Sequence, residues 1–485
     1  MGHIIGKDRN QVEIVSLEEL VEADSPARQI DKLIEEADTT YFEKSEAKAT
    51  GRRPYNPKDM LKLYVYGMEN GVVSSRKLDR ECKRNVELMW LMKGLQPDDK
   101  TICNFRRENA ESIAKFFNGF CRMLAEAGYI DGKIVAIDGT KIRANNSRRN
   151  NYSRKKLERS IEYIDRKIAE YMQELDKNDK IEELKERRAK YVKFKERIER
   201  GEVSEVSTTD TDSRMMKSNN GGADVSYNVQ AAVDGKNKLV TGLSVTNEPN
   251  DQGQLHKTAK KVKDNLGLKE MTVPADKGYY DTEDIKACHE DNITTIVAKP
   301  GDRTPNKEVF RKEDFQYDKE SDEYICPLGC VLKFAYEDKQ GFRHYRSYKA
   351  CGNCPLKADC TKSNRREITR HKYAEHAEQN DKDFAENQEI YKLRQQLSEH
   401  PFGTVKRTMG IRQFLTRGLK SVTAEAALIF LVYNLKRLRV IHNDNNKKDG
   451  QTAQISQFIR LFTIFATLLH LNEFYRKLTG LLYGS

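Results

Sequence analysis

From Lys133 to Ala298 the hydrophobic pattern alternates between strands and helices, and this order restricts the fold more than any other feature of the chain. Residues 134–137 form a short run of β-branched and small apolar residues that predicts a buried strand. Four more strands are expected, at 224–233, 239–245, 271–275 and 294–298. Helices at 254–266 and 281–291 separate the last three of them. Elements in this order predict an α/β fold built on a mixed sheet.

Asp138 and Asp276 each follow a short apolar strand directly, and a glycine comes soon after each of them. Binding and catalytic groups gather at the ends of strands in α/β folds. An aspartate close to a glycine is also an ordinary turn, so each aspartate taken alone has a loop without chemistry as its alternative. Two of them at matching topological positions favour a site whose carboxylates bind two Mg²⁺ ions, or Mn²⁺ in their place.

Residues 1–130 are expected to be helical. Asn56 is a candidate helix cap with Pro57 in the first turn, and further helix starts occur at Ser74 and in the segment 97–101. Short helices joined by short turns are typical of helix-turn-helix DNA readers. A plain helical bundle that makes dimer contacts explains the same pattern, so the region is interpreted as either DNA-binding or dimerising.

Charged helical segments flank and interrupt this pattern. Residues 150–201 have apolar residues at three- and four-residue steps and a polar break at 176–179, which predicts an antiparallel helical hairpin. Between Lys141 and Ser160 stand eight basic residues and one acidic residue, a local net charge of +7. Residues 446–485 are expected to form a C-terminal helical tail, which packs either on the domain or on a second copy of the chain.

The nine cysteines fall into two groups. Cys82, Cys103, Cys121 and Cys288 stand in apolar surroundings and are expected to be ordinary core thiols. The other five are crowded into one segment, at Cys326, Cys330, Cys351, Cys354 and Cys360. Outside a secretory pathway such crowding favours a structural four-coordinate Zn²⁺ site over disulfides. A metal-free insertion with reduced thiols is the alternative. His344 and His371 are candidate fourth ligands, but they lie outside the spacing and are expected at the surface instead.

Composition excludes a membrane protein. Hydrophobic residues make up 37% of the 485 residues and charged residues 33%. The C-terminal apolar run of residues 461–469 is far shorter than the roughly 20 residues that a membrane-spanning helix needs. No secretory signal is recognised, so a cytoplasmic protein is expected. The net charge of +11 is compatible with a polyanionic partner and does not by itself establish one.

One further motif carries a resemblance to a known family. The segment from Tyr391 to Lys406, taken together with residues 136–140, 227–230 and 275–279, resembles the DDE transposases of bacterial insertion sequences, in particular the branch with a Tyr, Arg, Glu, Lys signature around the last acid. The resemblance extends from about Tyr55 to Leu438. It implies an RNase H-like catalytic domain over residues 131–445, interrupted by the helical hairpin of 150–201 and by a cysteine-rich, zinc-binding insertion of 300–380.

The resemblance also implies roles for individual residues. Asp138, Asp276 and Glu399 correspond to the metal-binding catalytic triad of the family. Tyr391, Arg394 and Lys406 correspond to residues that bind DNA near the cut, with a solvated helix face as the alternative. Cys326, Cys351, Cys354 and Cys360 match the cysteine positions that similar transposases keep, which leaves Cys330 as the extra thiol.

The signature departs from its most familiar form in spacing. Four residues rather than three separate Arg394 from Glu399, which rotates Arg394 by about 100° on a helix relative to Glu399. Pro401 is incompatible with an undistorted helix, because its ring clashes with the carbonyl of Leu397. Two alternatives follow: the helix kinks there, or Ser398 caps a new helix that contains Glu399.

The function implied by the resemblance is transposition. Such an enzyme binds double-stranded DNA at terminal inverted repeats, hydrolyses a phosphodiester and joins the 3′-hydroxyl to target DNA, with a homodimer expected in the DNA complex. Two alternatives remain at this stage: a DNA-binding derivative that no longer cuts, and an RNase H-like nuclease that cuts without strand transfer.

Overall fold

The structure is a computed structural model that describes residues 10, 12, 14–42, 53–172, 178–217, 221–301, 310–347 and 349–449. The chain divides into two compact units. The first comprises Met1–Gly132, Asp138–Asn250 and Gln396–Ser485, and the second comprises Lys133–Ile137 and Asp251–Gln395. Beyond Asp449 the expected C-terminal tail of residues 446–485 lies outside the described residues.

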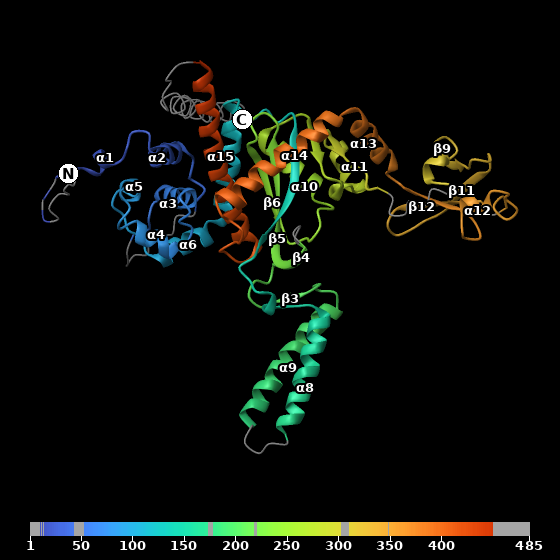
Figure 1. Cartoon of the computed structure of the whole chain (residues 1–485), viewed down its shortest axis with the longest axis horizontal. Helices are drawn as coiled ribbons and strands as arrows, with labels where there is room; N and C mark the ends of the chain where they lie inside the picture. Colours follow the sequence, from blue (N-terminus) through green and yellow to red (C-terminus); the bar gives the residue numbers. More distant parts are fainter. Residues whose placement is uncertain are drawn as a thin grey trace, which may run out of the picture. The chain divides into compact units, whose positions relative to one another are not determined.

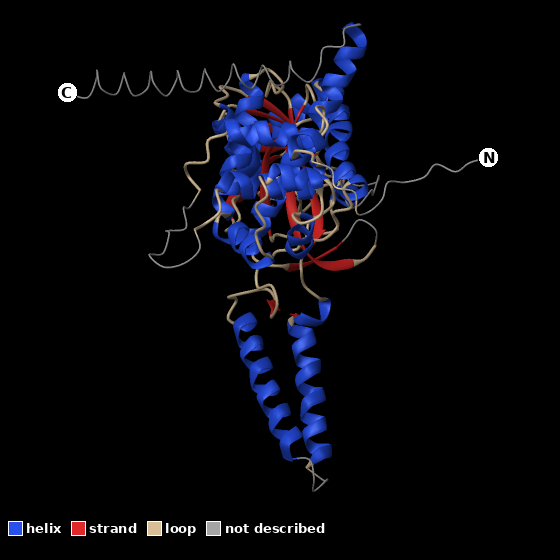
Figure 2. Ribbon diagram, turned by 90° about the vertical axis from the view of Figure 1, so that its left-hand side faces the viewer, coloured by secondary structure: helices blue, strands red, loops and turns tan. Residues whose placement is uncertain are grey.

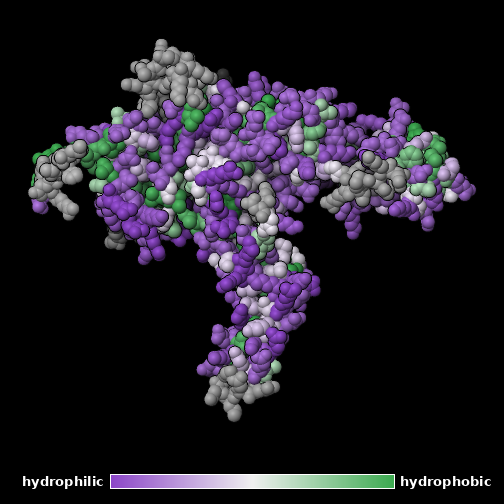
Figure 3. Space-filling view, in the orientation of Figure 1, coloured by the Kyte–Doolittle hydropathy of each residue, from purple (hydrophilic) through white to green (hydrophobic). Residues whose placement is uncertain are grey.

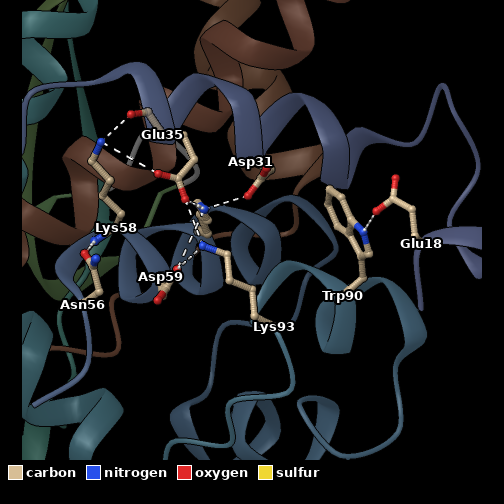
Figure 4. Close-up of polar contacts among 9 residues, drawn as sticks. Glu18, Asp31, Glu35, Asn56, Lys58, Asp59, Trp90 and Lys93 are labelled. Atoms are coloured by element: carbon tan, nitrogen blue, oxygen red, sulfur yellow. Dashed lines mark hydrogen bonds and ion pairs between the residues drawn. The ribbon is translucent and has the colours of Figure 1, made fainter. Parts of the chain in front are cut away.

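The N-terminal part of the first unit is helical, as expected (Figure 1). Its helices are α1 (Leu17–Leu20), α2 (Pro26–Glu36), α3 (Pro57–Glu69), α4 (Ser75–Glu81), α5 (Val86–Leu91), α6 (Asp99–Glu108) and α7 (Ala110–Glu126). Asn56 caps α3, because its side chain accepts a hydrogen bond from the Lys58 amide at 2.9 Å. α3 is buried almost throughout, and its core position Lys62 pairs with the carboxylates of Asp31, Glu35 and Asp59. Figure 4 labels these three acids together with Lys93, which pairs with Glu35.

One expected core thiol in this region is at the surface. Cys82, Cys121 and Cys288 are buried, but Cys103 is exposed, so the prediction for Cys103 was wrong. Within α6 the buried positions are Ile102 and Arg106, which are four residues apart and form the inner face of the helix. Cys103 follows Ile102 directly and therefore lies about 100° away from that face.

The long helix α15 (Leu419–Asp449) packs against α3, α7 and strand β6 within the first unit. Its residues 426–433 are all buried. Asn434 links α15 to β6, because its side chain accepts from the Val240 amide and donates to the Val240 carbonyl, each at 2.8 Å. A single buried amide side chain thus satisfies both backbone groups of one residue.

The central sheet is mixed, which confirms the α/β class. Its strands are β1 (Val135–Arg143), β4 (Arg214–Lys217), β5 (Ala223–Asp234), β6 (Val240–Thr246), β7 (Met271–Ala275) and β8 (Ile293–Val297). The strand order is β4-β5-β1-β7-β8, and β6 pairs with β5. The β4–β5 and β5–β6 pairs are antiparallel, whereas β1–β7 and β7–β8 are parallel. Strand β1 belongs to both units, since its first three residues lie in the second unit and the rest in the first.

In the second unit, helices surround the parallel strands. They are α10 (Leu255–Leu266), α11 (Thr282–Glu290), α13 (Ala374–Glu386) and the first half of α14 (Gln388–Gly403). α11 and α13 pack on β8, and α10 packs on β7. Asn380 of α13 binds the amide and the carbonyl of Val297 at 3.0 and 2.9 Å. This repeats the way in which Asn434 fixes α15 to β6.

Helices α8 (Arg154–Tyr171) and α9 (Asn178–Glu199) lie side by side and project from the first unit (Figure 2). Leu157, Ile164 and Tyr191 form a small buried core between them. Where the two helices join the rest of the unit, the short strands β2 (Asn151–Tyr152) and β3 (Val206–Ser207) pair in antiparallel fashion.

The segment that carries the clustered cysteines folds as an antiparallel sheet of its own. Its strands are β9 (Gln316–Asp318), β10 (Glu323–Ile325), β11 (Val331–Glu337), β12 (Phe342–Arg346) and β13 (Glu367–His371). They lie in the order β13-β12-β11-β10-β9. One face is closed by a buried cluster of Phe315, Tyr324, Leu332, Tyr345 and Ile368. A separate sheet in this segment was not predicted from the sequence.

Among the residues that the structure describes, none of the helices combines the length and the apolar character needed to cross a membrane.

Candidate catalytic site

Asp138 stands where strand β1 leaves the core. Val135, Ala136 and Ile137 are fully buried, and Asp138 is the first residue of the strand with partial exposure. Its Oδ1 accepts a hydrogen bond from the Gly139 amide at 2.8 Å. Thr140 comes two positions later on the same strand, so its side chain is directed to the same face of the sheet as that of Asp138.

Asp276 comes directly after strand β7, just as Asp138 comes directly after the buried part of β1. It follows the buried Ala275 and caps the short helix η2 (Lys277–Tyr279), because its Oδ1 accepts from the Lys277 amide at 2.7 Å. In the parallel pairing of β1 with β7, Ile137 is registered with Ala275. Each of these two partners is the residue directly before one of the predicted catalytic aspartates.

Lys406 contacts the strand that carries Asp138. It lies in η4 (Thr404–Thr408), a short π-helical turn directly after α14, and its Nζ donates a hydrogen bond to Thr140 Oγ1. The side chain is half-buried, and this burial lowers the pKa of Lys406. The contact joins residues 266 positions apart in the sequence and places a cation two residues beyond Asp138 on β1.

Glu399 lies on the outer side of α14, directly after the buried pair Leu397 and Ser398. The next residue, His400, bonds through Nδ1 to the Tyr433 hydroxyl of α15 at 2.9 Å. Since that hydroxyl donates to the Lys238 carbonyl at 2.7 Å, His400 Nδ1 is the donor in the first bond. Burial, followed by the charges of Arg437 and Lys238, lowers the pKa of His400 and so favours the neutral form of the imidazole. Glu399 is therefore an exposed residue of α14 that stands between the buried Ser398 and His400, which is bonded to α15.

Of the two alternatives at Pro401, a new helix capped by Ser398 is excluded, because α14 is a single helix at this point. α14 runs from Gln388 through Pro401 to Gly403, and the π-helical turn η4 follows without a break. A wider π turn relieves a helix whose regular hydrogen bonds are disturbed, and such turns recur at functional sites. The turn carries Lys406, so the irregularity belongs to the segment with the candidate DNA-binding lysine.

Tyr391 and Arg394 lie on the part of α14 that belongs to the second unit. The Arg394 guanidinium is positioned over the Tyr391 ring, 5.4 Å from its centroid. Tyr391 in turn packs edge-on against Phe384 at 4.8 Å. Both side chains are half-buried, and the stack holds the arginine in a fixed orientation.

Two further features of the first unit were missed from the sequence. Thr140 was not singled out, although its place two residues after Asp138 is a signal that could have identified it. The loop after η4 runs along the end of β1: the Arg143 amide donates to the Arg412 carbonyl at 3.2 Å, and the Phe414 amide donates to the Arg143 carbonyl at 2.8 Å. This pairing brings Arg143 and Arg412 together on neighbouring backbones.

Within the described ranges, no three or more His, Cys, Asp or Glu side chains are gathered in a way that would hold a metal ion. The five clustered cysteines are free thiols with partial exposure. Cys326 Sγ accepts from the Cys330 amide at 3.3 Å, which is the kind of bond that supports a thiolate ligand. The Cys326 thiol, burial and the Cys354 and Cys351 thiols raise the pKa of Cys330, so these sulfurs affect one another. The zinc site stays a prediction.

The two histidines near the cysteines are engaged elsewhere. His344 bonds to Glu367 at 2.6 Å and to Asp338 at 3.4 Å. His371 accepts at Nδ1 from the Tyr373 amide at 3.3 Å and is nearly buried. His344 is partly buried as well, so both side chains are held by the sheet rather than displayed at the surface.

Two family models match the chain. One, described as a Transposase DDE domain, matches residues 325–439, and the other, described as a Transposase domain (DUF772), matches residues 15–108. No curated protein and no solved structure matches it. The first match contains Glu399, Lys406 and the helices α13, α14 and most of α15, and the second contains helices α1 to α6. The two matches together support a DDE transposase of an insertion-sequence family.

Proposed function

We propose that this transposase cleaves DNA at the ends of an insertion sequence and joins the 3′-hydroxyl to target DNA. The observation that carries the proposal is the parallel register of Ile137 with Ala275, since Asp138 and Asp276 follow this registered pair by one residue each. Carboxylates at the ends of adjacent parallel strands are where an RNase H-like sheet would hold its catalytic acids.

In this proposal Asp138, Asp276 and Glu399 are the acids of the site. Carboxylate oxygens suit Mg²⁺ or Mn²⁺, and two such ions would supply an activated water or 3′-hydroxyl and stabilise the leaving oxygen. The acids of the two strands are held by local backbone bonds from the Gly139 and Lys277 amides, which orient one carboxylate oxygen of each acid.

Lys406 would bind a DNA phosphate next to the cut. In the free protein its Nζ is bonded to Thr140, an uncharged partner that a phosphate oxygen can replace with a gain in charge pairing. Its half-buried position strengthens that pairing, because charges interact more strongly away from bulk water. Tyr391 and Arg394, stacked on each other, would bind the DNA backbone further along α14.

We assign roles to the remaining parts of the chain on the basis of their charge and fold. Residues 131–445 would form the catalytic domain, interrupted by the hairpin of 150–201 and by the cysteine-rich segment of 300–380. Exposed arginines and lysines between Lys141 and Arg159 would face the phosphates of terminal inverted repeats. The helical region 1–130 would add DNA binding or dimer contacts within a homodimer, and residues 446–485 a C-terminal tail.

Replacing Asp138 by Asn tests the proposal. The variant keeps the size of the side chain and removes one metal-binding charge, so we expect cleavage of labelled end-bearing DNA in Mg²⁺ to fall below detection while DNA binding is retained. The matched control is Asp179→Asn, at an exposed acid in the first turn of α9, which should cleave normally. Undiminished cleavage by the Asp138 variant would refute the assignment.

The same assay separates the alternatives. A DNA-binding derivative would bind ends and cut nothing in Mg²⁺ or Mn²⁺, even with all acids in place. A nuclease without strand transfer would release cut ends and yield no joined product when target DNA is added.

A further inference from the structure

The sheet β9–β13 has one closed face and one open face. Tyr345 and Leu332 belong to the closed face, where the buried cluster lies. His344 and Arg346 flank Tyr345 on β12, and consecutive strand residues point to opposite sides, so both belong to the open face. The register pairs Arg346 with Lys333 and His344 with Tyr336 of β11.

A β-bulge explains how Lys333 and Tyr336 come to share this face. They are three positions apart, which in a regular strand would place them on opposite sides. The register shifts between Phe334 and Tyr336, and the extra residue changes the alternation. We call the set Lys333, Tyr336, Phe342, His344, Arg346 and His371 the aromatic face.

The rings of the aromatic face are ordered, and two of them, Tyr336 and Phe342, are accessible. Tyr336 stacks on His344 with ring centroids 4.2 Å apart and an interplanar angle of 10°. The Arg346 guanidinium lies over the Tyr336 ring at 5.0 Å and donates to its hydroxyl at 3.3 Å. Phe342 packs edge-on against His371 at 5.1 Å. Tyr336 and Phe342 nevertheless remain 42% and 39% exposed.

This part of the chain gathers exposed hydrophobic side chains on an otherwise hydrophilic surface (Figure 3). Of the fourteen large hydrophobic residues that are exposed in the described part of the chain, five lie in this segment (Leu328, Val331, Phe334, Tyr336 and Phe342), and two of these, Tyr336 and Phe342, belong to the aromatic face, whereas Phe334 is registered with Tyr345 of the closed face. Scattered single residues of this kind are normal, whereas a cluster marks a binding surface.

We propose that the aromatic face binds the unpaired bases of single-stranded DNA. Exposed rings on an open sheet face are stacking platforms for bases, and lysines and arginines next to them bind the phosphates. Lys333 is 77% exposed, pairs with Glu323 at 3.3 Å and stands opposite Arg346, so cations adjoin the rings on both strands and a phosphate would compete with this carboxylate for Lys333. A duplex, whose bases are stacked inside, would not use such rings. The inference rests on the proposed function in one respect, since strand cleavage is what would supply unpaired ends.

Glu367 on this face allows a test in which the affinity for single-stranded DNA is expected to rise instead of fall. Glu367 pairs with both Arg346 and His344, so a phosphate that binds Arg346 must compete with this carboxylate. Glu367→Gln preserves the shape and removes the charge. The variant should therefore bind single-stranded DNA more tightly than the natural chain, whereas damage to the sheet would weaken binding.

The experiment measures binding by the full chain in EDTA, so that no cleavage occurs. The probe is a fluorescein-labelled oligothymidylate of 15 nucleotides, compared with an abasic strand of the same length. Replacing Tyr336 or Phe342 by Ser should weaken binding of the oligothymidylate by about 5-fold to about 150-fold each, the range of stacking energies for one base. Binding of the abasic strand should not change. Tyr163→Ser, at an equally exposed tyrosine of α8, is the matched control.

Either of two results would overturn the proposal: an unchanged affinity for oligothymidylate, or an equal loss for the abasic strand. If the serine variants do not fold, two other experiments test the proposal: binding by Glu367→Gln, and photocrosslinking of the natural chain to a 5-iododeoxyuridine strand. Crosslinked adducts confined to regions outside 331–346 would contradict the proposal. Asp138→Asn should bind the oligothymidylate normally. This result distinguishes an error in the catalytic assignment from an error in the assignment of the aromatic face.

Discussion

At the scale of single residues, the most consequential side chain outside the candidate site is Lys62. It lies fully buried on α3, and its Nζ is 2.6 Å from Asp31 Oδ1 and 3.8 Å from Asp59 Oδ1, with Glu35 also bonded to it. A buried ammonium is costly unless it is paired, and here three carboxylates on α2 and α3 pair with it (Figure 4). The cluster fixes α2 onto α3.

Removing this cation should destabilise the N-terminal helices. Lys62→Ala leaves the surrounding carboxylates without their buried partner, and we expect a loss of about 3 kcal/mol, within the range for breaking a buried ion pair. The chain has one tryptophan, Trp90, whose Nε1 donates to Glu18 at 2.6 Å in the same region. Urea unfolding followed by its fluorescence therefore reports on this region.

The control for that measurement is Lys100→Ala, at an exposed lysine of α6, which should leave the urea midpoint nearly unchanged. Equal midpoints for the Lys62 variant and the natural chain would show that the buried cluster contributes nothing to stability.

The same cluster should make stability depend on pH. Burial acts to raise the pKa of Glu35, but hydrogen bonds from Lys62 and Lys93 hold it below its usual value of 4.5. A depressed carboxyl pKa contributes stability that is complete above the unfolded value and is lost as the pH falls through the folded value. The Trp90 transition should therefore weaken as the pH falls below about 4.5, and Glu35→Gln should reduce that dependence. An identical pH profile for the variant would contradict the assignment.

At the scale of elements, helices are fixed to strands by single buried amides. Asn434 of α15 satisfies Val240 of β6, and Asn380 of α13 satisfies Val297 of β8. These side chains replace a missing partner at each strand edge, which sets the position of each helix along its strand. The irregular element α14–η4 depends on similar anchors, since His400 is bonded to Tyr433.

Asn434→Ala should loosen β6. The change leaves the Val240 amide buried without its partner, whereas the Val240 carbonyl keeps the weak donor of the Cys121 thiol at 3.3 Å, so we expect a loss of about 1–3 kcal/mol. Hydrogen exchange of peptides covering Val240–Thr246 should become faster, while Val440→Ala, at an exposed position of α15, should not affect it. Unchanged exchange in β6 would show that other contacts hold the helix.

At the scale of the whole molecule, the chain passes between two compact units several times. The proposed acids are therefore drawn from distant segments: Asp138 from β1, Asp276 from β7 and Glu399 from α14. Strand alternation predicted the sheet and its class, and caps such as Asn56 predicted helix starts, because both signals depend on neighbouring residues. The sheet β9–β13 was missed, since strands such as β11 and β12 each bury one residue and show no apolar run like those of β7 and β8.

The sequence by itself determined that two apolar strands end in aspartates and that a Glu and a Lys follow on a later segment. Only the tertiary structure decided that Ile137 is registered with Ala275, that Lys406 is bonded to Thr140, and that α14 continues through Pro401. Periodicity and capping are local, whereas the register of β1 with β7 and the contact of Lys406 with Thr140 depend on residues more than a hundred positions apart. Contacts between such distant residues form only when the chain has packed.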